Sequence, residues 1–219
     1  MKQLFFLLLL VVSPFVYSQT DDSEYISEHI LSFESDMTIQ KNRKINITET
    51  ITVYSRGVQM VHGIYRDLPL EYEFEGGVNT VDFQLNTIKC DGKTEDYHTE
   101  DMDNGIRIYM GSKDRTLPIG KHVYEINYTV DHVLGIFEKY DEFYWNINGN
   151  GWSFIIDTVR ATVHLPKGAQ LKQYRGYTGS FGESGTDFTV DTISDGLQFE
   201  TTRYFTTGEN LTVAIGWNK

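Results

Sequence analysis

Two segments of the sequence concentrate charged and aromatic side chains that could act together. Residues 62–69 have the sequence HGIYRDLP, and residues 140–152 have the sequence YDEFYWNINGNGW. An arginine among carboxylates can form ion pairs that fix strands, whereas exposed aromatic rings can bind a ligand. The candidate binding residues in these segments are Tyr65, Arg66, Tyr144, Trp145 and Trp152.

A carboxylate in an apolar stripe is the third unusual feature. Between residues 45 and 53, isoleucine and valine alternate with polar residues, and Glu49 occupies a position of the apolar set. A buried charge is costly unless it is paired or hydrogen-bonded, and Arg66 could bind this carboxylate through two parallel hydrogen bonds. We therefore predict a structural ion-pair network. Its members are Glu49, Arg66, Asp67, Asp141 and Glu142.

The same residues allow two functional alternatives. Two carboxylates several ångströms apart can serve as acid and base in glycoside hydrolysis, and aromatic rings suit sugars. Asp141 and Glu142 are neighbours, however, and neighbouring side chains of a strand point to opposite faces. We therefore favour the structural network over a binding site, and a binding site over catalysis. No catalytic residue is assigned.

The elements that must position these residues are β-strands. Strict alternation of apolar and polar residues recurs along the chain, for example over 81–86, 124–130 and 159–165. Asp-Gly and Asn-Gly pairs between such runs are typical of tight hairpin turns. The pattern predicts an antiparallel β-sandwich of roughly eleven to thirteen strands, with one helical turn at most, over 134–139. Four glycines in 174–187 indicate a long hairpin that we expect to be mobile.

Length and charge limit the remaining possibilities. The chain has 219 residues, and residues 1–18 resemble a cleavable signal peptide, with Lys2 before an apolar run. Residues 19–219 then form a single sandwich domain with 18 basic and 31 acidic side chains, a net charge of −13. This balance excludes a nucleic-acid binder and disfavours direct adhesion to anionic lipid. No later apolar run reaches the roughly 20 residues of a membrane span, so we expect membrane contact only through segments beyond Lys219.

Metal and cofactor signals are weak. Cys90 is the single cysteine, so we expect a buried thiol and no internal disulfide. The histidines show no close pair, and zinc is not predicted. The segment Asp101–Gly105 resembles part of a calcium loop, but its glycine comes one position early, so an acidic hairpin turn is favoured. We predict no metal and no cofactor.

The chain also resembles a known family. The strand segment Thr48–Ile51, the block Gly63–Pro69 and the block Asp141–Trp152 are similar to the N-terminal extracytoplasmic domain of bacterial predicted membrane proteins, domain of unknown function 2207. The resemblance implies a β-sandwich outside the membrane, followed by transmembrane helices. It implies no established activity, so no catalytic residue is carried over.

These observations predict a non-enzymatic recognition module of a membrane-anchored bacterial protein. The module would be periplasmic or on the cell surface, and its partner would be an unknown protein. The alternative is an envelope glycan-binding or glycan-cleaving domain. That alternative requires at least two of the candidate aromatic rings to be exposed in one groove beside a carboxylate.

Overall fold

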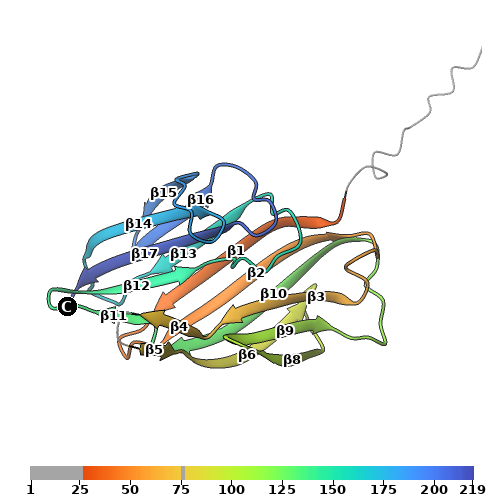
Figure 1. The fold of residues 1–219 in the computed structure, drawn as a ribbon, viewed down its shortest axis with the longest axis horizontal. Helices are drawn as coiled ribbons and strands as arrows, with labels where there is room; N and C mark the ends of the chain where they lie inside the picture. Colours follow the sequence, from red (N-terminus) through yellow and green to blue (C-terminus); the bar gives the residue numbers. More distant parts are fainter. Residues whose placement is uncertain (1–26, 75–76) are drawn as a thin grey trace, which may run out of the picture.

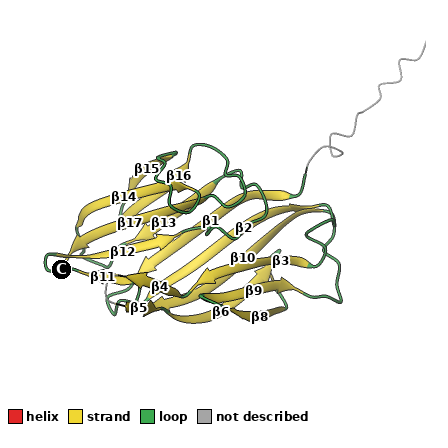
Figure 2. Ribbon diagram, viewed as in Figure 1, coloured by secondary structure: helices red, strands yellow, loops and turns green. Residues whose placement is uncertain are grey.

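The computed structural model describes residues 27–74 and 77–219, and within these ranges it contains seventeen strands and no helix (Figure 2). The predicted all-β class is confirmed. The strand count exceeds the expectation because short strands, such as β7 (Lys93–Thr94), are too brief for an alternating pattern. Residues 134–139, where the sequence allowed one helical turn at most, form none, because β11 (Leu134–Ile136) pairs with the following strand. The predicted signal peptide lies outside the described residues.

An eight-stranded sheet forms one layer of the molecule. Its order is β15-β16-β13-β1-β2-β10-β6-β7, and every neighbouring pair is antiparallel except β1 and β13. The strands not yet introduced are β1 (His29–Ile39), β2 (Ile45–Ser55), β6 (Asp82–Cys90), β10 (Gly120–Asp131), β13 (Val159–His164), β15 (Phe188–Ile193) and β16 (Gly196–Thr201).

Three smaller sheets complete the structure. Their orders are β11-β12-β17-β14, β3-β9-β8 and β4-β5. The strands are β3 (Gly63–Pro69), β4 (Glu71–Phe74), β5 (Gly77–Thr80), β8 (Tyr97–Met102), β9 (Gly105–Gly111), β12 (Tyr140–Asn146), β14 (Leu171–Gly179) and β17 (Asn210–Asn218). Figure 1 shows β12 and β3 running across the long strands β1, β2 and β10, which gives the molecule its two layers.

The core lies between these layers. Every second side chain of β2 is buried, including Ile47 and Ile51, while the alternate polar side chains, Thr52 excepted, are only partly buried. Removing such an isoleucine side chain from water stabilises the fold by about 1.5–3 kcal/mol. Glu49 belongs to the inward set and is 0% exposed. The acid therefore lies in the core that joins the two layers.

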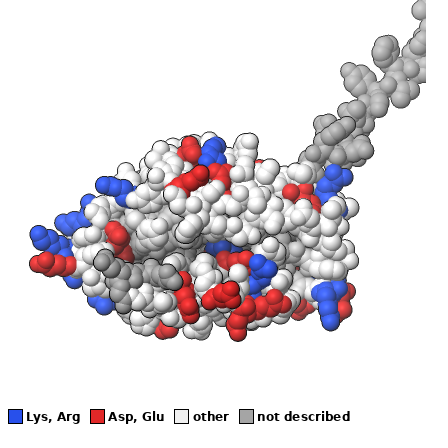
Figure 3. All heavy atoms as spheres, in the orientation of Figure 1, with Lys and Arg blue, Asp and Glu red and all other residues white. Residues whose placement is uncertain are grey.

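Basic side chains gather at the end of the molecule where the chain terminates (Figure 3). A pocket at this end is lined by Lys41, Arg43, Lys167 and Lys219. The acidic excess of the chain is therefore not distributed evenly, because the hairpins next to the C-terminus carry positive charge.

Candidate functional site

Glu49 and Arg66 form a buried ion pair between the eight-stranded sheet and β3. The Arg66 Nε and Nη2 atoms donate to the two carboxylate oxygens of Glu49, each at 2.8 Å. The Tyr128 hydroxyl on β10 donates to the same carboxylate at 2.7 Å. Arg66 is 2% exposed, so neither charge is screened by water.

The remaining donors of Arg66 bind backbone carbonyls. Nη1 donates to the carbonyls of Asp67 and Asn148 at 3.0 and 2.7 Å, and Nη2 donates to that of Ile147 at 2.8 Å. All five guanidinium hydrogens are thus used, as a buried arginine requires. Because residues 147 and 148 follow β12, this Arg66 network connects three of the four sheets.

Electrostatics keep the network charged. Burial alone would lower the pKa of Arg66, but the neighbouring charge of Glu49 outweighs it and raises that pKa above its ordinary value. Burial and the charge of Glu49 together raise the pKa of Tyr128 well above its ordinary value. The phenol therefore stays neutral and remains a hydrogen-bond donor.

Glycines in the second block allow the backbone to approach Arg66. Gly149 has a left-handed φ of 72°, and a Cβ atom there would lie 2.9 Å from Arg66 Nη1. A Cβ at Gly151 would lie 2.9 Å from a carboxylate oxygen of Asp67. Trp152 donates from Nε1 to the Asn148 carbonyl at 2.8 Å. The two sequence blocks are therefore packed directly against each other.

The other predicted network members lie outside this cluster. Asp67 accepts two hydrogen bonds from Arg107, at 2.6 and 2.7 Å. Glu142 accepts one from Gln173 at 2.9 Å, and Asp141 pairs in register with Trp217 near the C-terminus. Of the predicted network, the structure thus joins Glu49 to Arg66 and places Asp67 beside them in a separate pair. It does not join Asp141 or Glu142 to Arg66.

The predicted binding residues do not share one groove. Arg66, Trp145 and Trp152 are buried, and Tyr65 is half-buried, with the Arg107 guanidinium 4.2 Å from its ring centre. Tyr144 alone is open, at 51% exposure, so the predicted aromatic residues do not meet the condition set for the glycan alternative, and a saccharide site would need aromatic residues outside that set. The alternation of β12 explains the difference, because it turns Trp145 into the core and Tyr144 outward.

Tyr144 lines a pocket of about 460 Å³ on the outer face of β12, β17 and β14. Asn210 and Thr212 of the central strand β17 form its floor. Thr212 lies between its register partners, Asn146 on β12 and Tyr177 on β14. Phe181, which is 97% exposed, stands at the rim. We call this the Tyr144 pocket. It is lined by Tyr144, Asn146, Asn150, Tyr177, Thr178, Gly179, Ser180, Phe181, Gly182, Glu183, Ser184, Asn210 and Thr212.

Apart from the carboxylate of Glu183, the pocket is lined by uncharged side chains, many of which can form hydrogen bonds. Burial and the neighbouring Tyr177 raise the pKa of Tyr144, so its hydroxyl stays protonated at neutral pH. Asn210 accepts from the Gly149 amide at 2.7 Å and donates to Thr212 at 2.8 Å. The pocket floor is therefore bonded to the backbone that surrounds Arg66.

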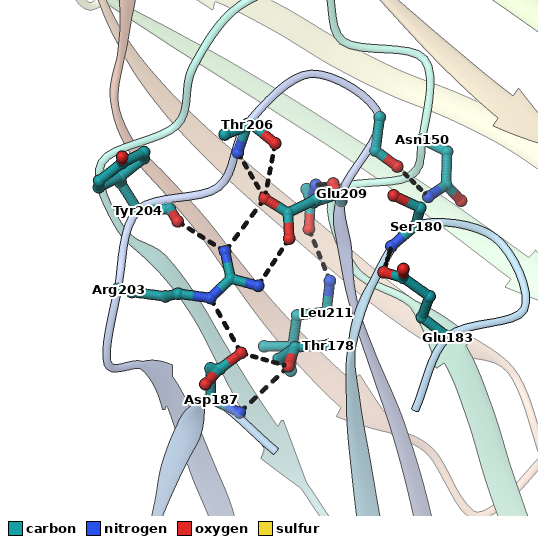
Figure 4. Close-up of polar contacts among 12 residues, drawn as sticks. Asn150, Thr178, Ser180, Glu183, Asp187, Arg203, Tyr204, Thr206, Glu209 and Leu211 are labelled. Carbon is teal, nitrogen blue, oxygen red and sulfur yellow. Dashed lines mark hydrogen bonds and ion pairs between the residues drawn. The ribbon is translucent and has the colours of Figure 1, made fainter. Parts of the chain in front are cut away.

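Charged residues hold the loops beside the pocket (Figure 4). Arg203 donates to Asp187 at 2.9 Å and to both oxygens of Glu209, at 2.6 and 3.0 Å. Asn150 donates to the Gly208 carbonyl at 2.6 Å, and Glu183 accepts from the Ser180 amide at 2.8 Å. The glycine-rich segment expected to be mobile is thus bonded to its surroundings at Asp187, which accepts from Arg203 and from the Thr202 amide.

Comparison with known proteins identifies the family. The N-terminal domain of a predicted membrane protein family, DUF2207, matches residues 29–217. The chain belongs to this family. The resemblance found in the sequence blocks is confirmed. This DUF2207 domain is also 29% identical over 178 residues to the uncharacterized protein YciQ of Escherichia coli K12, covering 80% of the chain and 28% of YciQ.

Solved structures share the fold at low sequence identity. Native yeast leukotriene A4 hydrolase, in two structures, matches with TM-scores of 0.54 and 0.53 and 10% identity. These matches cover 86% and 93% of the DUF2207 domain and 29% and 32% of the hydrolase chain. The chain thus spans about a third or less of YciQ and of the hydrolase, and at 10% identity the likeness to the hydrolase concerns the fold alone. Within residues 27–74 and 77–219, no helix has the length and apolarity needed to cross a membrane.

Sequence reasoning missed most of the Tyr144 pocket. Tyr177 and Phe181 belong to the segment that was interpreted only as a glycine-rich hairpin, and Asn210 starts the last strand. The aromatic residue Phe181, which lies between Gly179 and Gly182, was the sequence feature that could have indicated a binding surface there. In the DUF2207 domain the acidic segment Asp101–Gly105 forms the turn between β8 and β9, as the favoured interpretation predicted.

The Arg203 network predicts a specific response to acid. Hydrogen bonds from Arg203, opposed by burial and assisted by Thr206, lower the pKa of Glu209 from 4.5 to about 2. A lowered carboxyl pKa stabilises the fold above the ordinary value, and this contribution is lost as the pH falls through the folded value. In Glu209→Gln we expect a loss of about 1 kcal/mol at neutral pH that disappears between pH 4.5 and 2.

Chemical denaturation at several pH values measures this effect. The control is Glu34→Gln, because Glu34 is 46% exposed and its contact with Arg160 spans 3.6 Å. Parallel pH profiles for Glu209→Gln and the unmodified chain would contradict the assignment.

Proposed function

We propose that this chain is the extracytoplasmic recognition module of a membrane-anchored bacterial protein, and that its ligand binds in the Tyr144 pocket. The apolar N-terminal segment after Lys2 and the family of predicted membrane proteins support the location. One observation carries the site: three aromatic side chains, Tyr144, Tyr177 and Phe181, surround side-chain amides in an open pocket.

The position of the pocket fits this role. Asn210 and Thr212 line it at the start of β17, whereas Asn218 ends the same strand beside the C-terminus. A strand rises about 3.3 Å per residue, so the pocket lies roughly 25 Å from that end. If the polypeptide enters the membrane after this domain, the pocket faces away from the bilayer and towards the envelope.

The chemistry of the pocket favours a neutral saccharide over a peptide. Aromatic rings offer flat apolar surfaces for sugar faces, and Asn146, Asn150 and Thr212 offer donors and acceptors for hydroxyl groups. Glu183 is the single carboxylate among the described residues that line the pocket, and it already accepts from Ser180. Since hydrolysis of a glycoside uses two carboxylates, we propose binding without cleavage.

Titration of the mature chain with soluble envelope oligosaccharides, followed by calorimetry and NMR, tests the proposal. We expect Tyr144→Ala, Tyr177→Ala and Phe181→Ala each to weaken binding about two- to tenfold, because each removes a ring worth about 0.5–1.5 kcal/mol. Tyr97→Ala is the matched control for Tyr144→Ala, since Tyr97 is 52% exposed on β8, outside the pocket. Equal affinity in all variants, or binding of a protein partner alone, would refute the saccharide assignment.

A further inference from the structure

Cys90, Asp91 and His122 form a compact cluster away from the Tyr144 pocket. Cys90 ends β6, Asp91 begins the turn to β7, and His122 lies on β10, the neighbour of β6. One ligand atom from each residue (Sγ, a carboxylate oxygen and a ring nitrogen) lies within 4.8 Å of the other two. These atom types are the ones that zinc proteins use.

The backbone brings two adjacent residues to the same cluster. Neighbouring side chains on a regular strand point to opposite faces, and Lys89 accordingly pairs with Glu125 at 2.7 Å. Asp91 departs from this pattern because its φ is 50°, in the left-handed region. Its Oδ1 accepts from the Val123 amide at 2.9 Å, which fixes the carboxylate over β10.

The hydrogen bonds of His122 define where a cation would bind. Its Nε2 lies 2.9 Å from the Pro118 carbonyl oxygen, which can only accept, so Nε2 carries a proton. A neutral ring then presents its lone pair at Nδ1, 2.8 Å from Asp91 Oδ2. Two acceptors at that distance repel unless a proton or a metal ion lies between them. A histidine that binds metal through one nitrogen and donates to a carbonyl through the other is the usual arrangement of such sites.

The placement of Cys90 is compatible with a bound cation. The residue is 8% exposed, and its sulfur lies within 4.8 Å of a ligand atom of Asp91 and of His122. A divalent ion deprotonates a thiol that coordinates it, so the thiolate would form when the ion binds. The Asp91 side chain is 50% exposed, which leaves one side of the cluster open to water.

We infer that Cys90, Asp91 and His122 bind one Zn²⁺ ion, with solvent in the fourth coordination position. The ion replaces the thiol proton and any second proton on His122, and both are released to water. Tetrahedral zinc ligands stand roughly 3.3–3.8 Å apart, so the 2.8 Å contact between Asp91 and His122 opens by about 0.5–1 Å. The mixed sulfur, nitrogen and oxygen set suits Zn²⁺ better than Mg²⁺ or Ca²⁺.

Cobalt and zinc titrations of the mature chain test the inference. We expect one equivalent of Co²⁺ to produce a thiolate-to-cobalt charge-transfer band, and one equivalent of Zn²⁺ to abolish it. Cys90→Ser should lose the band and weaken Zn²⁺ binding at least 100-fold, more than the roughly 10–100-fold cost of removing an outer-shell partner. Asp91→Asn and His122→Asn should also weaken it.

A second histidine provides the control. His164 lies between Asp195 and Asp36, at 2.9 and 3.3 Å, and belongs to no metal-ligand cluster of the described chain. His164→Asn should therefore bind Zn²⁺ as tightly as the unmodified chain. The inference fails if the unmodified chain gives no charge-transfer band. This outcome does not depend on the folding of any variant. It also fails if folded Cys90→Ser keeps its zinc affinity.

Discussion

Replacing Arg66 with alanine is expected to lower the free energy of unfolding by roughly 3–5 kcal/mol. The substitution leaves Glu49, which is 0% exposed, without its counter-ion. It also removes the donors to the carbonyls of Ile147 and Asn148. Urea denaturation, followed by tryptophan fluorescence, measures the change.

Arg107→Ala is the matched control for this experiment. Arg107 forms an equally short bidentate pair with Asp67, but its side chain is 30% exposed. Partly exposed pairs contribute about 1 kcal/mol or less, so this variant should remain close to the unmodified chain. Equal losses for the two alanine variants would mean that burial of the Glu49 charge does not determine the stability.

Arg66→Lys separates charge from geometry. An ammonium supplies the positive charge but cannot form two parallel bonds to Glu49 and reach three carbonyls as well. We expect Arg66→Lys to lower the free energy of unfolding, but by less than Arg66→Ala does. A lysine variant as stable as the unmodified chain would show that charge alone is sufficient.

The fold was predictable where one face of a strand is buried. In β2 and β10 apolar and polar positions alternate along most of the strand, with Glu49 and His122 as polar residues in the inward sets, and the sequence alone places these strands. The four-residue strand β5 (GVNT) carries no such pattern, and β4 (EYEF) alternates over too few residues to be assigned from the sequence. β17 was recognisable as a strand, but its burial on both faces depends on β12 and β14, which are distant in sequence.

The candidate site was predictable only in part, for a related reason. Glu49 was conspicuous as an acid in an apolar stripe, and Arg66 was a chemically suitable partner. The backbone carbonyls that complete the Arg66 network have no sequence signature. Tyr144 and Tyr177 meet only because β12 and β14 both pair with β17. The Cys90 cluster similarly requires the pairing of β6 with β10 and the left-handed turn at Asp91.

The segment Asn148-Gly149 connects the Arg66 network to the Tyr144 pocket. Asn148 donates to the Glu209 carbonyl and accepts from the Leu211 amide, and Gly149 donates to Asn210, which lines the pocket. The buried ion pair of Glu49 and Arg66 thus supports the floor of the Tyr144 pocket. Preorganised polar groups cost less entropy on binding than mobile ones.

Gly149→Ala tests how tightly the backbone packs against Arg66, and we expect it to lower the free energy of unfolding by about 2–5 kcal/mol. An alanine in the left-handed region costs about 1–2 kcal/mol, and forcing a methyl group into a packed core adds about 1–3 kcal/mol. Gly57→Ala isolates the first contribution, because Gly57 has a φ of 70° and no atom lies within 4 Å of the position that its new methyl group would take. We expect it to lose about 1–2 kcal/mol.

A double-mutant cycle then identifies the atom that the new methyl group meets. In an Arg66→Ala background the guanidinium nitrogen 2.9 Å from the Gly149 Cβ position is gone. The cost of Gly149→Ala should therefore fall to that of Gly57→Ala, giving a coupling energy of about 1–3 kcal/mol. Additive losses would place the clash elsewhere. A reduced cost would mean that this glycine is required because Arg66 occupies the space beside it.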